Sequence, residues 1–122
     1  MIDWTNYPNF SRDEFDSKDL PGSGDNMQRE QLNHLQRARN IAGLPFKINS
    51  GFRTPEHNKK VGGKPNSAHL RGWATDIQTP DAQTRYKVLH ALFKVGYTRI
   101  GIYDNFVHCD CDPSLPQNVI WV

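Results

Sequence analysis

Three residues of this chain combine the side-chain types and the spacing of a metal site. His69 and Asp76 lie seven positions apart with a glycine between them, and His108 lies further along the chain. We expect a loop to present His69 and strands to present Asp76 and His108. Two histidines and one carboxylate that leave a fourth position open are the ligand set of a catalytic zinc site. The residues therefore suggest a zinc centre, although their spacing alone does not establish one.

The other histidines and the two cysteines carry weaker signals. His34 and His90 fall inside expected helices and His57 follows a helix start, so we interpret all three as surface or boundary residues. On a strand, alternation places His108 and Asp110 on one face and both cysteines, Cys109 and Cys111, on the other. Two cysteines so close in sequence form neither a disulfide framework nor a four-thiolate zinc site, and we expect reduced thiols.

Apolar periodicity and capping residues predict two long helices and two short ones. The first long helix spans 27–42, with Gly43 as its C-cap and an apolar stripe at Met27, Leu32, Leu35, Ala38, Ile41 and Ala42. The second spans about 79–95, ends at Gly96, and has an expected inner face of Ala82, Tyr86, Leu89, Leu92 and Phe93. Short helices are expected to start at Ser11, which opens a capping box, and at Thr54-Pro55, the latter ending near Gly62.

Strand-like segments lie between and after these helices. They span 46–49, 73–78, 98–103, 106–111 and 118–122, and Asp104-Asn105 forms a hairpin turn signal. Residues 1–26 are expected to be largely irregular and 64–72 to form a loop. Two main helices packed on a small, mostly antiparallel sheet predict an α+β fold, in one domain of 122 residues.

Several segments together resemble the zinc D-Ala-D-Ala carboxypeptidases, metallopeptidases that cut peptidoglycan stem peptides. Ser50-Gly51-Phe52-Arg53 is similar to the SGYR segment of this family, residues 67–76 to its SxHxxGxAxD motif, and His108-Cys109-Asp110 to its late HxD motif. The matches occur in the family's order, lie within residues 10–111, and are closest to the small single-domain branch found in bacteriophage genomes. The resemblance implies a hedgehog/D,D-peptidase-like fold and a single zinc peptidase domain over 1–122.

The resemblance also implies roles for individual residues. His69, Asp76 and His108 are the implied ligands of one Zn²⁺ ion. Arg53 is implied to contact the substrate and to stabilise the charged transition state, which suits a guanidinium because it stays charged. Ser67 is implied to hydrogen-bond the substrate or the site loop, and its alternative role is a loop cap. Trp73 either lines the cleft or packs in the interior.

The chain departs from the family pattern at the general base. Many members carry Glu or Asp three residues before the last zinc histidine, where this chain has Asn105, which cannot accept a proton. Asp110 is the preferred candidate for the base because it shares the face of His108, and Asp104 is the second candidate. Asp110 has an alternative role as a carboxylate that orients a ligand histidine. The departure leaves a non-catalytic cell-wall-binding or virion module as the alternative function.

Charge and hydropathy limit the classes of partner that we expect for this chain. The formal net charge is +2, which does not indicate a nucleic-acid binder, and no apolar run is long enough to insert into a membrane. The expected substrate is a peptidoglycan stem or cross-bridge peptide, cut by an endopeptidase or a D,D-carboxypeptidase. We expect a monomer without a signal peptide, which is either held in the host cytoplasm before release to the cell wall or associated with a virion.

Overall fold

The computed structural model describes all of residues 1–122 and has an α+β fold, as the sequence predicts. Its α-helices are α1 (Arg29–Ala42), α2 (Pro55–Lys60) and α3 (Ala82–Val95). The strands are β1 (Ile48–Ser50), β2 (Ala74–Gln78), β3 (Arg99–Ile102), β4 (Phe106–Asp110) and β5 (Val119–Trp121). They form one sheet in the order β1-β2-β4-β3-β5, in which only the β3–β5 pair is parallel.

The helix ends follow local chemistry. The Thr54 hydroxyl accepts the His57 backbone N–H at 3.1 Å and Pro55 occupies the first turn of α2, which confirms that N-cap. Gly43 and Gly96 end α1 and α3 with φ of 68° and 95°, a left-handed conformation that glycine adopts without strain. Helix α1 begins two residues later than predicted.

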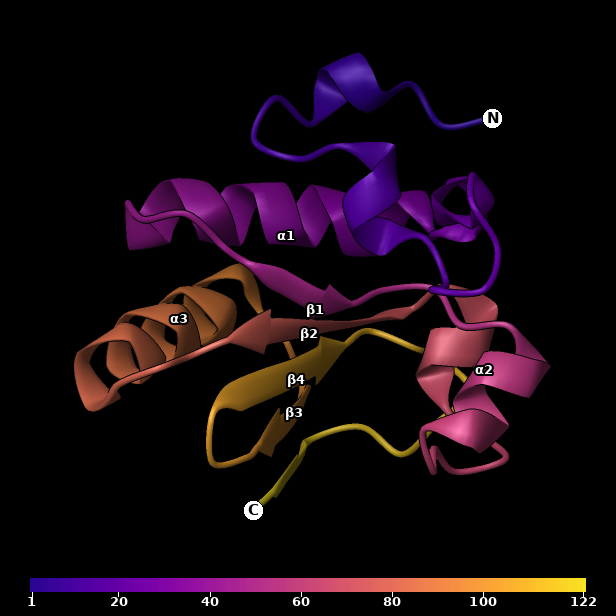
Figure 1. The fold of residues 1–122 in the computed structure, drawn as a ribbon. Coiled ribbons are helices and arrows are strands. Elements are labelled where there is room, and N and C mark those ends of the chain that lie inside the picture. Colours follow the sequence, from indigo (N-terminus) through magenta and orange to yellow (C-terminus); the bar gives the residue numbers. More distant parts are fainter.

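Helices α1 and α3 pack against each other on one face of the sheet, whereas α2 lies at the opposite end of the strands from α3 (Figure 1). The buried apolar residues of the two long helices are Leu32, Leu35 and Ala38 on α1, and Val88, Ala91 and Leu92 on α3. The predicted inner face of α3 is wrong at Ala82, Tyr86 and Phe93. All three are exposed, Tyr86 and Phe93 to 70% and 50%. The buried face of α3 runs through Val88, Ala91 and Leu92 instead, since contacts with α1 and β4 set the rotation of the helix. No helix combines the length and the hydropathy needed to cross a bilayer.

The N-terminal segment contains three short 3-10 helices, η1 (Trp4–Asn6), η2 (Arg12–Phe15) and η3 (Ser23–Asn26), and covers α1 (Figure 1). Phe15 is fully buried, and the Tyr7 hydroxyl donates to Asn33 on α1 at 2.8 Å. The capping box at Ser11 is present, as predicted. The expected loop over 64–72 instead contains a fourth 3-10 helix, η4 (Ala68–Arg71), because the Ser67 hydroxyl caps it by accepting the His69 backbone N–H.

Strand alternation gives the sheet two chemically different faces. Ile77, Ile100 and Val107 point toward α1 and α3 and join the hydrophobic core. Neighbouring positions on the other face form a row that crosses all five strands through backbone pairing. In order across the sheet, the row is Ser50, Asp76, His108, Gly101 and Trp121.

A bulge in β1 brings Ser50 into this row. Ile48 pairs with Ile77 on the core face, but the register shifts before Ser50, which pairs with Asp76 on the other face. A bulge re-aims the side chains that follow it, and here it directs the Ser50 hydroxyl toward the polar residues.

Candidate metal centre

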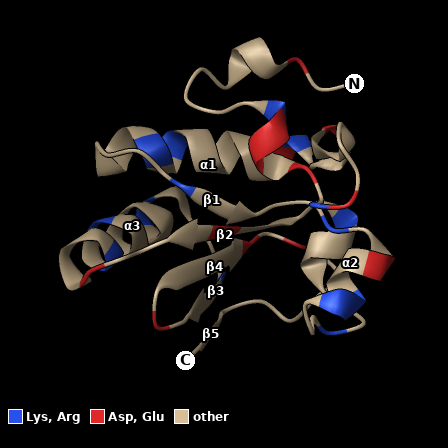
Figure 2. Cartoon of the chain, in the orientation of Figure 1, with Lys and Arg blue, Asp and Glu red and all other residues tan.

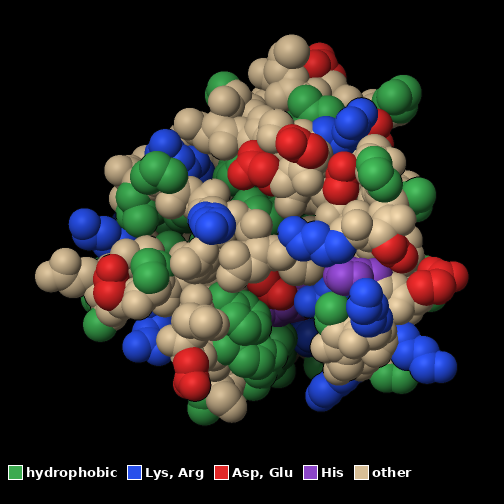
Figure 3. Space-filling model, viewed as in Figure 1, with side chains coloured by type: hydrophobic (Ala, Val, Ile, Leu, Met, Phe, Trp, Pro, Cys, Tyr) green, Lys and Arg blue, Asp and Glu red, His purple; other side chains and the backbone are tan.

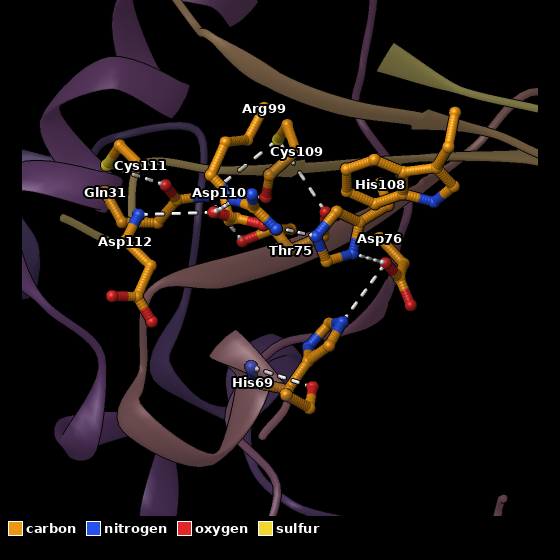
Figure 4. A network of polar contacts seen from close by, with 12 residues as sticks. Gln31, His69, Thr75, Asp76, Arg99, His108, Cys109, Asp110, Cys111 and Asp112 are labelled. Carbon is orange, nitrogen blue, oxygen red and sulfur yellow. Dashed lines mark hydrogen bonds and ion pairs between the residues drawn. The ribbon is translucent and has the colours of Figure 1, made fainter. Parts of the chain in front are cut away.

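The three predicted ligands lie together on the open face of the sheet. His69 Nε2 and His108 Nδ1 are 3.2 Å and 3.0 Å from the same oxygen, Asp76 Oδ1, so the carboxylate stands between the two rings (Figure 4). One ligand atom from each residue lies within 4.8 Å of the other two. Two nitrogens and one carboxylate oxygen that converge in this way suit Zn²⁺ and leave a fourth position open.

The orientation of His69 is fixed from behind. Its Nδ1 lies 2.7 Å from the Gly51 carbonyl oxygen, which can only accept, so Nδ1 carries the proton and Nε2 is left for a metal. Gly51 is required here because a Cβ atom would lie 2.8 Å from the Phe15 backbone. The pKa of His69 lies below its usual value because burial disfavours the charged ring more strongly than Asp76 favours it.

The second histidine, His108, is held by two carboxylates. Its Nε2 donates to Asp110 Oδ2 at 2.7 Å, which leaves Nδ1 pointing toward Asp76. Burial alone would lower the pKa of His108, but the hydrogen bonds to Asp110 and Asp76 outweigh burial and raise the pKa to about 9. A metal at the centre therefore has to displace a proton from this ring.

Asp76 is buried yet remains a carboxylate. Burial raises its pKa, but His69 and His108 together lower the pKa by more than burial raises it. The pKa of Asp76 therefore lies well below its usual range. Its second oxygen, Oδ2, accepts from Arg53 Nη2 at 3.3 Å. This contact occupies one oxygen of Asp76 and leaves the other, Oδ1, for the metal position.

Arg53 is itself held in place on three sides. Besides Asp76, its Nε donates to the Ser50 hydroxyl at 3.0 Å and its Nη1 donates to Asn58 Oδ1 at 3.2 Å. Asn58 is buried and also donates to the Lys64 carbonyl at 3.0 Å. These contacts hold the guanidinium in one orientation and thereby fix the direction of its remaining N–H groups.

The centre lies in a cleft of about 610 Å³. One side is formed by the segment that follows α2, including Val61, Gly63 and Lys64, and the other by Tyr103, Phe106 and Trp121. Figure 3 shows a hollow between a hydrophobic patch and a segment that bears Lys and Arg side chains. The last turn of α2 holds Lys59 and Lys60, and Figure 2 shows basic residues around this helix.

The structure brings some predicted site residues to this cleft and leaves others outside. Arg53, Ser67 and Asp110 line it together with the three ligands, whereas Trp73 and Asp104 do not. Asp104 is exposed in the turn between β3 and β4. Asp110 is fully buried and already accepts from His108 and from Arg99 Nε, the latter at 2.7 Å.

Several cleft residues were not identified from the sequence. On the side formed by β3, β4 and β5 they are Arg99, Tyr103, Phe106 and Trp121. Tyr103 and Phe106 stack with their ring centroids 4.4 Å apart, and Trp121 Nε1 donates to the Tyr103 hydroxyl at 2.8 Å. The Asp104-Asn105 turn signal indicates the pairing of β3 with β4, but no local sequence pattern indicates the parallel pairing of β3 with β5 that brings Trp121 to the cleft.

The two cysteines lie on the core side of β4, as alternation predicts, and both are free thiols. Burial raises the pKa of Cys109 well above its usual value and that of Cys111 to about 12. Both sulfurs contact the buried Gln31, on the side of the sheet away from His69 (Figure 4). Neither thiol is available to the metal centre.

Comparison with known families agrees with this geometry. The sequence model of the family Peptidase M15 matches residues 8–110, most of the chain and all three candidate ligands. The chain belongs to the M15 peptidase family. None of the curated proteins matches the sequence closely enough to count as a relative. M15 peptidases are zinc-dependent, and the two nitrogens and one oxygen of the centre are donors that fit this metal.

Proposed function

We propose that this M15 peptidase is a zinc metallopeptidase that hydrolyses peptide bonds next to D-amino acids in bacterial peptidoglycan. The observation that carries the proposal is the convergence of His69, Asp76 and His108 within 4.8 Å of one another in an open cleft. A structural zinc site usually fills four positions with protein ligands, whereas three ligands facing a cleft leave a position for water or substrate. This arrangement favours catalysis over a purely structural metal.

In this proposal, His69, Asp76 and His108 hold one Zn²⁺ ion. Zinc bound there supplies activation of water and polarisation of the scissile carbonyl. Arg53 stays charged, and its N–H groups not engaged by Ser50, Asn58 and Asp76 donate to the oxygen on which negative charge develops. Arg53 thus positions Asp76 and contacts the substrate.

We assign Asp110 the role of orienting His108 rather than that of the general base. Its Oδ2 accepts from His108, its Oδ1 accepts from Arg99 and from the Asp112 backbone N–H, and the side chain is fully buried, so the carboxylate is engaged behind the ligand histidine. A carboxylate behind a ligand histidine fixes the ring and raises its basicity. Asp104 is exposed in the turn, and the cleft offers no carboxylates other than Asp76 and Asp110.

This lack of a free carboxylate is the specific observation that favours the second candidate function. In that alternative, the chain keeps the fold and the zinc but binds the cell wall, or serves in a virion, without cutting. Both candidate functions require zinc, so metal content does not distinguish them. Hydrolysis of purified peptidoglycan distinguishes them, because only the peptidase cuts it.

The residues that line the cleft indicate the class of substrate. Arg53, Lys64 and a bound divalent ion make the cleft electropositive, which suits an acidic peptide such as a peptidoglycan stem or cross-bridge. Ser67 lines the cleft, and its hydroxyl, which accepts the His69 N–H, still has its own hydrogen to donate to a substrate carbonyl. Preference for D-residues is carried by the family resemblance.

We also propose that the protein is a monomer that acts on the cell wall. It reaches the wall either after accumulation in a host cytoplasm or as part of a virion. Neither a membrane nor nucleic acid is required as a partner.

The test is digestion of purified peptidoglycan by the zinc-loaded protein, with products identified by mass spectrometry. Release of free D-Ala indicates a D,D-carboxypeptidase, whereas release of peptide fragments from cross-linked material indicates an endopeptidase. His69→Ala is expected to abolish either product, and His90→Ala, which removes an exposed histidine on α3, to leave both unchanged. Zinc-loaded protein that releases no product from several peptidoglycan types contradicts catalysis and favours the binding module.

A further inference from the structure

Trp121 is the last member of the row that crosses the sheet. Strand β5 pairs Trp121 with Gly101 on β3, and Gly101 pairs with His108 on β4. Paired residues of neighbouring strands point to the same face. The indole therefore lies on the cleft face with the metal ligands, although residues 111–122 lie beyond the part of the chain that the family sequence matches.

Gly101 provides the space that the indole occupies. A Cβ atom at this position would lie 2.3 Å from Trp121 Nε1 and 2.5 Å from Cε2, distances that no side chain tolerates. The indole therefore lies across the backbone of β3 and reaches His108, with the two ring centroids 5.3 Å apart and the planes tilted by 47°. Any residue other than glycine at position 101 has to displace the indole.

The indole is fixed by polar groups at its edge and its face. Its Nε1 donates to the Tyr103 hydroxyl at 2.8 Å, and the Arg99 guanidinium carbon lies 5.4 Å from the ring centroid, within the range of a cation–π contact. Arg99 is the residue that donates to Asp110, and Asp110 accepts from His108. Trp121 therefore packs against both ends of the chain of contacts behind this ligand.

We propose that Trp121 is a positioning residue of the metal centre, which acts by holding the ring of His108 in place. Hydrogen bonds at Nδ1 and Nε2 fix His108 within its own plane, and the indole restricts tilting of the ring out of that plane. The indole also keeps water from the contacts among His108, Asp110 and Arg99, which strengthens them. The proposal rests on the zinc site of the proposed function, but it concerns metal binding and not hydrolysis.

The test measures zinc affinity by competition with a chromophoric chelator, and ligand geometry by the visible spectrum of the Co²⁺-substituted protein. Trp121→Ala is expected to weaken zinc binding about tenfold, the lower end of the range for partners outside the ligand shell, and to change the Co²⁺ spectrum. Trp121→Phe keeps a ring over His108 and is expected to retain most of the wild-type zinc affinity. Ile120→Ala is the matched control, because Ile120 precedes Trp121 on the same strand, faces the other way and is 57% exposed.

Gly101→Ala tests the same contact without removing the indole. The new methyl group has to push the ring away from His108, so zinc affinity is expected to fall and the Co²⁺ spectrum to change as in Trp121→Ala. If Trp121→Ala does not fold, Gly101→Ala takes its place in the test. Wild-type zinc affinity and an unchanged Co²⁺ spectrum in folded Trp121→Ala, or in Gly101→Ala as its replacement, overturn the proposal. A wild-type protein that binds zinc but cuts no peptidoglycan contradicts the proposed function alone, and one that binds no zinc contradicts both.

Discussion

The two faces of β2 and β4 are built from alternate residues of the same strands, yet they do different work. On one face, Ile77 and Val107 are fully buried against α1 and α3, where apolar burial stabilises the fold. On the other, Asp76 and His108 are surrounded by charged and hydrogen-bonding groups at the floor of a cleft. One stretch of sequence therefore supplies both stability and chemistry, and single substitutions can separate the two.

The largest expected effect on the cleft face comes from Asp76→Asn. Removal of a direct ligand charge is expected to weaken zinc binding by more than about a hundredfold, since loss of an outer partner alone costs about 10–100-fold. Peptidoglycan hydrolysis is expected to fall in parallel. Metal content after dialysis measures zinc binding, and digestion of purified peptidoglycan measures hydrolysis. Zinc retained at wild-type level contradicts the assignment of this ligand.

The next residue along β2, Ile77, lies on the core face, where a substitution is expected to change stability and not metal binding. Ile77→Ala is expected to lower the free energy of unfolding by about 2–5 kcal/mol, because it leaves a cavity among buried side chains. The folded fraction is expected to bind zinc as the wild type does. Urea unfolding and a zinc titration test this, and a normal stability combined with lost zinc would reverse the roles of the two faces.

Asp110→Asn separates an orienting carboxylate from a general base. If Asp110 orients His108, zinc affinity is expected to fall about 10–100-fold, and saturating zinc is expected to restore much of the hydrolysis. If Asp110 is the base, zinc affinity stays near the wild-type value and kcat falls even in saturating zinc. Chelator competition and kinetics at several zinc concentrations distinguish the two outcomes.

The pKa of His108 predicts how zinc binding depends on pH. Zinc requires the neutral ring, and the metal-free ring has a pKa of about 9, above the usual value near 6.5. The apparent zinc affinity is therefore expected to rise about tenfold per pH unit between about pH 7 and 9, as one proton no longer has to be displaced. His69 does not add to this slope because its pKa is lowered. Zinc affinities that stay constant over this interval contradict the prediction.

The same shift predicts the stability of the metal-free protein. A folded-state pKa above the unfolded value means that charged His108 stabilises the fold. This contribution is fully present below about pH 6.5 and is lost as the pH rises through 9. Denaturant unfolding of the metal-free protein at several pH values measures it, and His108→Gln is expected to remove the trend.

The smallest expected effect is that of Asn105→Asp. It installs an acid where many family members carry the general base, but residue 105 is exposed in the turn and does not line the cleft. Hydrolysis is expected to stay within about twofold of the wild type, as for most surface substitutions. A large gain in kcat would show that this turn approaches the metal during catalysis.

Much of the site could be predicted from the sequence because its signals are local. Alternation along β4 correctly separates His108 and Asp110 from the cysteines, and the Thr54-Pro55 pair correctly marks the start of α2. The resemblance in residues 67–76 also picks out ligands that the fold does bring together.

The remainder depends on contacts between distant segments. Arg99 and Trp121 enter the cleft through the pairing of β3 with β4 and β5, and a parallel pair at the end of the chain leaves no turn signal. On α3, hydrophobicity favours Tyr86 and Phe93 as core residues, but contacts with α1 and β4 set the rotation of the helix and leave both rings exposed. The role of Asp110 likewise depends on Arg99, which approaches it from another strand.

The most direct test of this account is the zinc content of the untagged protein, measured by elemental analysis beside His69→Ala and the surface control His90→Ala. We expect about one zinc per chain in the wild type and in His90→Ala, and none in His69→Ala. Wild-type protein without zinc after reconstitution, or His69→Ala protein that keeps its zinc, contradicts the claim that the open face of the sheet is a zinc centre.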